Sequence, residues 1–213
     1  MRRIRIVVAY DGTNYCGWQI QPNGITIEEI LNRQISKLTG EDIRIIGASR
    51  TDSGVHALGN VAVFDTESRI PGDRFAHALN QKMPEDIVIV RSDEVQIDWH
   101  PRYQNEISKT YEYHIYNAKV RNPLKNRYST FVSFDLDVEK MRQGAKYILG
   151  EHDFASFCNV RTNAKDTVRT VHEITIKEIP MDKFQASNWG QENSNLENEK
   201  EIVIRVTGNG FLY

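Results

Sequence analysis

The chain has 213 residues, of which 39% are hydrophobic and 26% are charged, and its formal net charge at pH 7 is −2. This length and composition predict a soluble globular protein that buries its core as one large domain or as two domains of about 100 residues each. No apolar stretch approaches the roughly 20 residues of a membrane span, which excludes a membrane-spanning protein.

The cysteines and the N-terminal residues bear on the compartment. Cys16 and Cys158 are the only cysteines, they form no CxxC pair, and no Asn-x-Ser/Thr sequon occurs. The basic start, MRRIRIVVAY, is followed at once by Asp11 and Gly12, so its apolar run is too short for the core of a signal peptide. We therefore expect a cytoplasmic protein with no membrane association.

The first half of the chain alternates predicted strands and helices. Branched apolar residues predict a strand at residues 2–11, which ends at the Asp11-Gly12 turn. Thr26 and Glu29 form a capping-box pattern before apolar residues with helical spacing, which predicts a helix that ends at Gly40. Further along we expect strands at residues 42–49, 60–66 and 86–95, and a second helix at residues 71–81.

The pattern then restarts after a polar joint near residue 105. We expect a strand at residues 109–117, a helix at 138–150, and strands at 169–179 and 201–207, with an acidic low-complexity loop at 191–201. The sequence therefore predicts an α+β protein with two similar halves, residues 1–105 and 106–213. Each half has a mostly antiparallel sheet backed by helices, and we expect a substrate cleft between the two sheets.

A basic, tyrosine-rich segment begins at the joint. Residues 101–130 contain five tyrosines and only two acidic residues, beside six cations: Arg102, Lys109, Lys119, Arg121, Lys125 and Arg127. Such a mixture suits a nucleic-acid interface, because cations bind phosphates and aromatic rings stack on bases. A solvated strand face with a basic loop is the alternative that this feature leaves open.

Three other candidate sites are weak. Residues 6–13, IVVAYDGT, are similar to the start of a phosphatase motif, but Ala9 stands where the phosphorylated Asp would be. The GNG at residues 208–210 lacks the third glycine of a dinucleotide site. The six histidines show no metal-ligand spacing, so we expect no metal.

The most informative stretch is GASRTDSGVHALGN at residues 47–60. It places Arg50, Asp52 and His56 among small residues directly after a predicted buried strand. Catalytic groups occur on loops that a rigid scaffold holds in this way. An isolated Asp at a turn is usually a cap, but the nearby Arg50 can keep the carboxylate ionised or contact a phosphate.

This stretch resembles the signature of the TruA-type tRNA pseudouridine synthases, in which a Gly-Arg-Thr-Asp-Ala-Gly-Val-His-Ala segment presents the catalytic aspartate. Ser49 and Ser53 stand where that family usually has Gly and Ala. Other stretches resemble the family in the same order, so that the resemblance spans the chain: AYDGTNYCGWQIQPNGITIEEILN, FAHALNQKMPEDIVI, WHPRYQNEISKTYEYHIYN, GEHDFASF, RTVHEI and GNGFLY.

The resemblance implies two RRM/ferredoxin-like halves and an isomerase that converts uridine to pseudouridine at positions 38 to 40 in the anticodon stem-loop of tRNA. It implies that Asp52 is the catalytic carboxylate, that Arg50 helps to extrude the nucleotide, and that Tyr111 stacks on the uracil and assists its deprotonation. Arg169 is a plausible partner of the carboxylate. The reaction has no net redox change, so we expect no cofactor. Whether Asp52 attacks the ribose, attacks the base or removes a ribose proton stays open.

The expected partners are tRNA and a second copy of the chain in a homodimer. We expect tRNA phosphates at Arg102, Lys119, Arg121 and Lys125. A noncatalytic RNA-binding module with twin sheets is the main alternative, but it does not require Arg50 and Asp52 in one loop.

The last residues, EIVIRVTGNGFLY, predict a half-buried strand, a turn, and the first residues of an apolar helix. The resemblance implies that a long helix follows and covers the second sheet. We therefore expect the second domain to be truncated before its last helix, with less stability and activity than a longer form.

Overall fold

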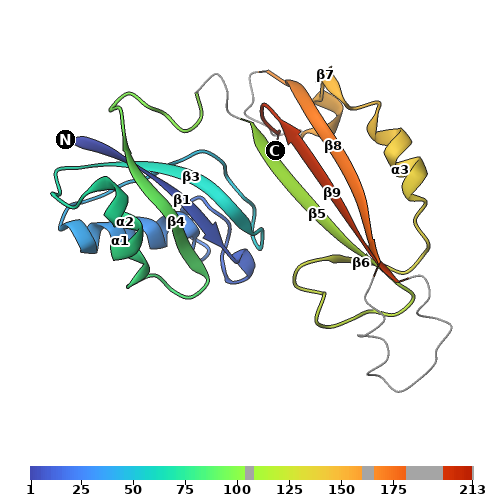
Figure 1. Ribbon diagram of the computed structural model, residues 1–213, viewed down its shortest axis with the longest axis horizontal. Helices are drawn as coiled ribbons and strands as arrows, with labels where there is room; N and C mark the ends of the chain where they lie inside the picture. The colour runs from blue at the N-terminus through green and yellow to red at the C-terminus, as the bar shows by residue number, and fades with distance from the viewer. Residues whose placement is uncertain (104–107, 160–165, 181–198, 213) are drawn as a thin grey trace. The chain divides into compact units, whose positions relative to one another are not determined.

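The computed structural model describes residues 1–103, 108–159, 166–180 and 199–212. The chain divides into two compact units, Met1–Glu106 and Ile107–Tyr213, and each unit combines one sheet with helices (Figure 1). The α+β class that the sequence predicts is confirmed.

The first unit has a four-stranded sheet in the order β2-β3-β1-β4, and every neighbouring pair is antiparallel. Its strands are β1 (Arg2–Tyr10), β2 (Ile46–Gly47), β3 (Ala57–Thr66) and β4 (Ile87–Val95). The even-numbered residues of β1, from Ile4 to Tyr10, are buried, because successive side chains of a strand point to opposite faces. On the other face, Arg3 and Arg5 form ion pairs with Asp65 of β3 and Asp93 of β4.

Two helices cover the buried face of this sheet (Figure 1). The helix α1 (Ile27–Thr39) begins and ends as predicted: the Thr26 hydroxyl accepts a hydrogen bond from the Glu29 N–H at 3.3 Å, and Gly40 adopts a left-handed φ of 76°. The predicted second helix is divided into a short 3₁₀ helix, Gly72–Arg74, and α2, Phe75–Asn80. The core between sheet and helices includes Trp18, Phe64 and Phe75, each nearly inaccessible to solvent.

The strand predicted at residues 42–49 is mostly absent, since β2 contains only Ile46 and Gly47. Ile43 and Ile45 are buried, as the apolar pattern requires, but their backbone N–H groups donate to the side chains of Ser36 and Asn32 on α1. These two helix side chains replace the strand partner that the backbone would otherwise need. The pattern correctly predicted burial and the pairing of Ile46 and Gly47, and wrongly predicted that residues 42–45 pair as a strand.

The second unit has a five-stranded sheet in the order β6-β5-β9-β8-β7. The pair β5–β6 is parallel and the other pairs are antiparallel, so this sheet is mixed. Its strands are β5 (Lys109–Asn117), β6 (Thr130–Val132), β7 (Gly150–Asp153), β8 (Val168–Pro180) and β9 (Lys200–Gly208). The sequence predicted β5, β8 and β9 but not the short strands β6 and β7.

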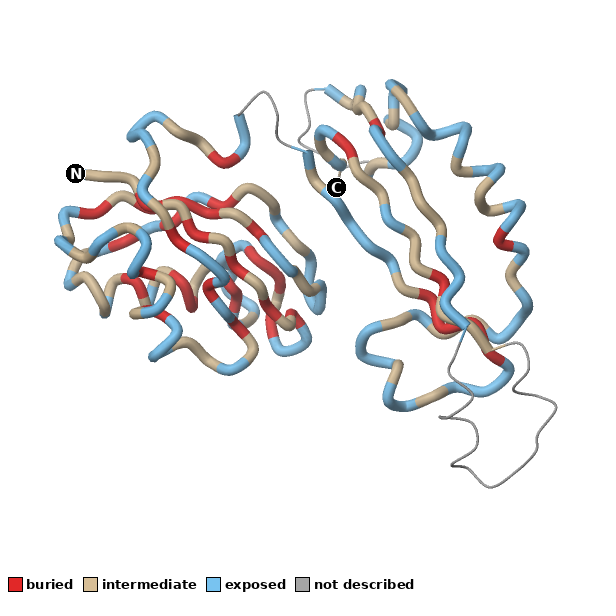
Figure 2. The backbone as a smooth tube through the Cα atoms, viewed as in Figure 1, coloured by how far each residue is buried: buried red, intermediate tan, exposed pale blue. Residues whose placement is uncertain are grey.

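The helix α3 (Val138–Ala145) packs on this sheet and is shorter than predicted. Its N-terminus is capped by the Asp137 carboxylate, but the predicted last residues form turns that lead to Gly150, whose φ of 100° begins β7. Ile115, Val138 and Ile202 form a small buried cluster. Figure 2 shows buried residues along most elements of the first unit and at far fewer places in the second.

Three strands of each unit follow the same order, although the two sheets differ in their number of strands. In the first, β1 and α1 are followed by β2 and β3, and β3 lies between β1 and β2. In the second, β5 and α3 are followed, after the short β7, by β8 and β9, and β9 lies between β5 and β8. The acidic loop predicted at residues 191–201 lies almost entirely outside the described residues. The helix predicted to begin near Phe211 is not tested, because the described residues end at Leu212.

Candidate active site

Residues 48–56, here called the aspartate loop, connect β2 to β3 and contain Arg50 and Asp52. Tyr15 and Trp18, in the segment that follows β1, hold this loop through hydrogen bonds. The backbone N–H of Trp18 donates to the Thr51 carbonyl at 3.0 Å, and the Gly54 N–H and the Ser53 hydroxyl both donate to the Tyr15 carbonyl, at 3.3 and 3.2 Å. The loop is therefore fixed on both sides of Asp52.

Glycines in the preceding segment permit this close approach. Gly17 has a φ of 81°, a conformation that other residues rarely adopt. A Cβ atom at Gly17 would also lie 2.5 Å from the Thr51 carbonyl oxygen. On β2, a Cβ at Gly47 would collide with the indole of the buried Trp18. Packing therefore requires glycine at positions 17 and 47, beside the loop.

The side chains of Arg50 and Asp52 are exposed although the backbone is held. Within the described part of the chain, neither side chain makes a hydrogen bond or an ion pair, with the other or with any third residue. Of the two roles that the sequence leaves open for Arg50, an ion pair with Asp52 is therefore not formed, and contact with a phosphate remains a prediction. The loop thus presents a cation and a carboxylate that remain available to a ligand.

His56, the last residue of the aspartate loop, connects the loop to the turn at Asp11 and Gly12. Its Nδ1 accepts a hydrogen bond from the Gly12 N–H at 3.1 Å and lies 3.0 Å from Oδ1 of Asp11. Asp11 also accepts from the Thr13 N–H, so it caps the turn that the sequence predicted there.

In the second unit, the turn after β9 contacts Tyr111 and lies beside Arg169. The ring of Phe211 meets the ring of Tyr111 edge to face, with centroids 4.9 Å apart. A Cβ at Gly210 would lie 3.5 Å from Nε of Arg169. Asn209 holds this turn, because its N–H donates to the Thr170 carbonyl and its side-chain oxygen accepts from the Thr170 N–H.

Sequence reasoning missed Asn209 and Phe211 as parts of the candidate site. A signal was available, since the glycines at 208 and 210 bracket Asn209 directly after a strand. Only the fold shows that this turn contacts Tyr111, which lies almost a hundred residues earlier in the chain.

The cations predicted to bind tRNA phosphates are largely engaged within the protein. Arg102 donates from Nε to the Gly47 carbonyl at 2.7 Å. Lys119 and Lys125 each lie 3.2 Å from a carboxylate oxygen, of Asp135 and Glu201 respectively. Arg121 lies over the ring of Phe131, 5.3 Å from its centroid.

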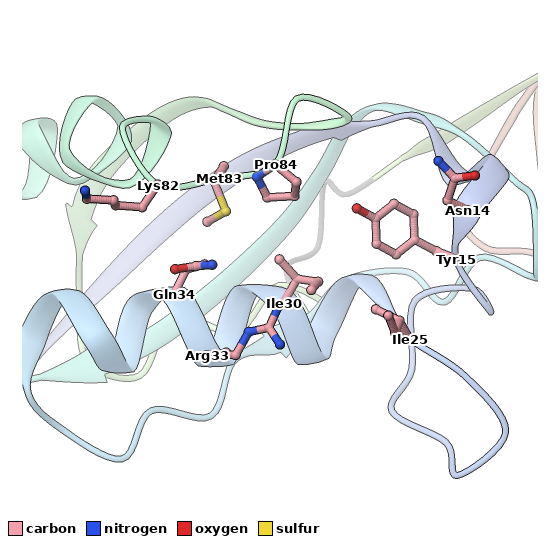
Figure 3. A pocket seen from close by; sticks show the side chains of 9 residues that line it. All are labelled: Asn14, Tyr15, Ile25, Ile30, Arg33, Gln34, Lys82, Met83 and Pro84. Carbon is pink, nitrogen blue, oxygen red and sulfur yellow. The ribbon is translucent and has the colours of Figure 1, made fainter.

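A pocket of about 350 Å³ lies on the helical side of the first unit, between α1, Asn14 and Tyr15, and the α2–β4 connection (Figure 3). Its lining is apolar apart from Arg33, Lys82, two amides and the Tyr15 phenol. Burial raises the pKa of Tyr15, as does the hydrogen bond from its hydroxyl to Asp86 at 2.5 Å. No carboxylate, histidine or cysteine is among the nine lining residues, so Lys82 and the Tyr15 phenol are the only groups of this pocket that could transfer a proton.

Neither a metal site nor a membrane span is found among the described residues. No three His, Cys, Asp or Glu side chains in that part of the chain lie close enough to hold a metal ion. None of the helices there has the length and hydropathy that crossing a membrane requires.

Comparison with known proteins assigns the chain to a family. The family model described as tRNA pseudouridine synthase matches residues 6–104 and 145–213. The chain is 44% identical over 214 residues to tRNA pseudouridine synthase A of Acetivibrio thermocellus and 41% identical over 213 residues to that of Thermoanaerobacter sp. (strain X514). It is also 44% identical over 213 residues to tRNA pseudouridine synthase A 2 of Clostridium perfringens. Each match covers the whole chain and 79% of the relative. The chain therefore belongs to the tRNA pseudouridine synthase A (TruA) family of isomerases.

Proposed function

We propose that the chain isomerises uridine to pseudouridine at positions 38 to 40 in the anticodon stem-loop of tRNA, in the cytoplasm, with Asp52 as the single catalytic carboxylate and without a cofactor. The observation that supports this role is the aspartate loop itself. The backbone of Thr51 and Gly54 and the hydroxyl of Ser53 are hydrogen-bonded to Tyr15 and Trp18, while the side chains of Arg50 and Asp52 make no hydrogen bond or ion pair with the described residues. A catalytic group needs this combination of a fixed backbone and an available side chain.

The reaction breaks the bond from ribose C1′ to uracil N1 and joins C1′ to C5, and the proton at C5 is lost while N1 gains one. No electrons are gained or lost overall, so the reaction needs no redox cofactor. A carboxylate can serve in it as the nucleophile or as the base. Extrusion of the uridine costs a few kcal/mol, which a stacking ring and a cation can offset. We assign stacking and assistance at C5 to Tyr111, nucleotide extrusion to Arg50, and partnership with the carboxylate to Arg169.

We further propose that both units are RRM/ferredoxin-like halves of one RNA-binding fold, with 1–105 carrying the aspartate loop. The shared strand arrangement, with the third strand between the first two, supports this. The RNA-binding cleft and the homodimer remain predictions, as do phosphate contacts by Arg102, Lys119, Arg121 and Lys125. Any contact by Lys119 or Lys125 has to compete with an existing ion pair.

The test is tritium release from C5-labelled uracil in tRNA. Asp52→Asn should reduce the rate by far more than tenfold while tRNA binding and the melting temperature stay close to those of the unmodified protein, because an amide matches the carboxylate in shape but is neither nucleophile nor base. The matched control is Asp42→Asn, which changes another exposed aspartate of the same unit and should leave the rate unchanged.

Retention of a tenth of the original rate by Asp52→Asn would exclude Asp52 as the catalytic group. Tight tRNA binding without any tritium release by the unmodified chain would favour the alternative, a noncatalytic RNA-binding module.

A further inference from the structure

A chain of three polar side chains leads from the core of the first unit to the residue beside Asp52. The Nδ2 of Asn60 lies 3.4 Å from the Tyr10 hydroxyl, which lies 2.8 Å from the Thr51 hydroxyl. Tyr10 is the last residue of β1, Asn60 is on β3, and both are more than nine-tenths buried. Thr51 is half-buried, and Asp52, which follows it, is exposed.

The donors and acceptors define a direction along this chain. Asn60 Nδ2 can only donate, so the Tyr10 oxygen accepts from it, and the single Tyr10 hydrogen is available to the Thr51 hydroxyl. Asn60 Nδ2 also donates to the Ser49 carbonyl at 3.0 Å. Asn60 thereby binds the loop directly before Arg50, and Tyr10 binds it directly before Asp52.

The contact between the hydroxyl groups of Tyr10 and Thr51 is additional to the backbone hydrogen bonds of the aspartate loop. The Thr51 carbonyl is already held by the Trp18 N–H, and the ring of Tyr10 already packs near the indole of Trp18, with centroids 6.0 Å apart. The Tyr10 hydroxyl adds a constraint on the Thr51 side chain alone. Fixing this side chain limits the rotation of the peptide unit that carries Asp52.

We infer that Tyr10 and Asn60 are positioning residues for the reaction, which act on Asp52 through the Thr51 hydroxyl and the Ser49 carbonyl. This inference rests on the proposed role of Asp52. A small displacement of a catalytic group lowers the rate of the chemical step more than substrate binding, since binding depends on many other contacts.

The experiment compares variants that each remove one hydroxyl group. Tyr10→Phe keeps the ring and its packing, and Thr51→Val keeps the shape of the side chain. Each should lower the single-turnover rate of tritium release on saturating tRNA about tenfold, with little change in the KM for tRNA. Thr51→Ser keeps a hydroxyl group and should retain most of the rate.

A double-mutant cycle tests whether the two hydroxyl groups act together. If Tyr10 acts through Thr51, the variant with both Tyr10→Phe and Thr51→Val should be no slower than either single variant. Tyr116→Phe is the matched control: it removes the hydroxyl of another buried tyrosine, in the second unit, which bonds to Glu199, and it should leave the rate unchanged.

Three results would overturn the inference: an unchanged rate in Tyr10→Phe, equal loss in Thr51→Ser and Thr51→Val, or rate losses that multiply in the double variant. If Tyr10→Phe is too unstable to measure, the comparison of Thr51→Val with Thr51→Ser decides, since Thr51 lies nearer the surface. Asp52→Asn distinguishes the two proposals. An active Asp52→Asn contradicts the proposed function, whereas an inactive Asp52→Asn beside a fully active Tyr10→Phe contradicts only the positioning role.

Discussion

Neighbouring residues hold the backbone around Asp52, while its carboxylate makes no hydrogen bond with the described residues. The residues before and after it donate or accept hydrogen bonds through Thr51, Ser53 and Gly54, and all of these bonds reach the segment from Tyr10 to Trp18. A buried carboxylate would need partners of its own, and these would compete with a substrate. An exposed carboxylate on a restrained backbone avoids this competition.

The ring of Tyr111 is positioned by an aromatic contact with Phe211. It is 37% exposed, and its ring meets Phe211 edge to face at an interplanar angle of 83°. Tyr111→Phe keeps this contact and the stacking face and removes only the hydroxyl group. We expect it to slow tritium release at least about tenfold with tRNA affinity unchanged, because the effect is confined to proton transfer. Tyr111→Ala should also weaken binding, since stacking contributes roughly 1–3 kcal/mol per base.

The control is Tyr113→Phe on the same strand, whose hydroxyl bonds to Thr130 at 2.8 Å. It should turn over at the original rate. Equal turnover in Tyr111→Phe and the unmodified protein would remove the phenol from the chemistry and leave only stacking.

At the scale of the elements, the strands β5 and β9 are joined by polar side chains on one face as well as by backbone bonds. Thr110 bonds to Thr207, and Glu112 forms an ion pair with Arg205 at 2.7 Å. Farther along, His114 Nδ1 lies 2.7 Å from Glu201. Cross-strand pairs of this kind stabilise a sheet whose buried cluster is small.

The ionisation of Glu201 makes the stability of the β5–β9 strand pair depend on pH. Its hydrogen bond with His114 and, secondly, its contacts with Lys125 hold the pKa of the Glu201 carboxyl below its ordinary value of 4.5. A depressed pKa in the folded state contributes stability that is fully present above the unfolded value and is lost as the pH falls through the folded value. Glu201→Gln should therefore lower the melting temperature of the second unit at neutral pH, with a difference that shrinks below about pH 4.5.

Thermal unfolding from about pH 7 to about pH 3 measures this difference. Glu151→Gln, on the short strand β7, is a suitable control, because Glu151 is exposed and should show no such trend. A Glu201→Gln difference that stays constant across the pH range would contradict the coupling to ionisation.

At the scale of the whole molecule, the net charge of −2 is a poor guide to tRNA binding. Several cations of both sheets form ion pairs with carboxylates, so we expect phosphates to bind to local groups of the other cations. We expect tRNA affinity to fall steeply with salt, because bound phosphates release counterions. Reversing Lys119 and Arg121 to Glu should weaken binding and reduce the slope of log affinity against log salt by roughly 0.7–0.9 for each phosphate that the variant no longer binds.

The rate on saturating tRNA should not change in this variant, which separates binding from chemistry. The matched control reverses Lys146 and Lys177, two exposed lysines of the same unit, and it carries the same change in net charge. Equal weakening by both double variants would indicate a general charge effect, and a salt dependence close to zero would exclude a phosphate-lined site.

The local pattern of the sequence was sufficient for the elements whose signals are short-range. The helix α1 could be predicted with both ends, since the cap at Thr26 and the left-handed Gly40 lie next to the apolar residues they bound. β5 could be predicted to the residue from its alternating aromatic and branched side chains. Family membership was likewise readable, because the SRTDSGVHALGN stretch is long and specific.

Tertiary structure decided what depends on partners far away in the chain. Ile43 and Ile45 are buried as their pattern indicates, but helix side chains rather than a strand satisfy their backbone. The sequence alone gave no sign that Glu201 lies beside Lys125, and no local signal placed Phe211 on Tyr111 or the Tyr10 hydroxyl on Thr51. The physical reason is that caps and periodicity are set by residues within one or two turns, whereas pairing is set by whichever side chain the completed fold brings within hydrogen-bond distance.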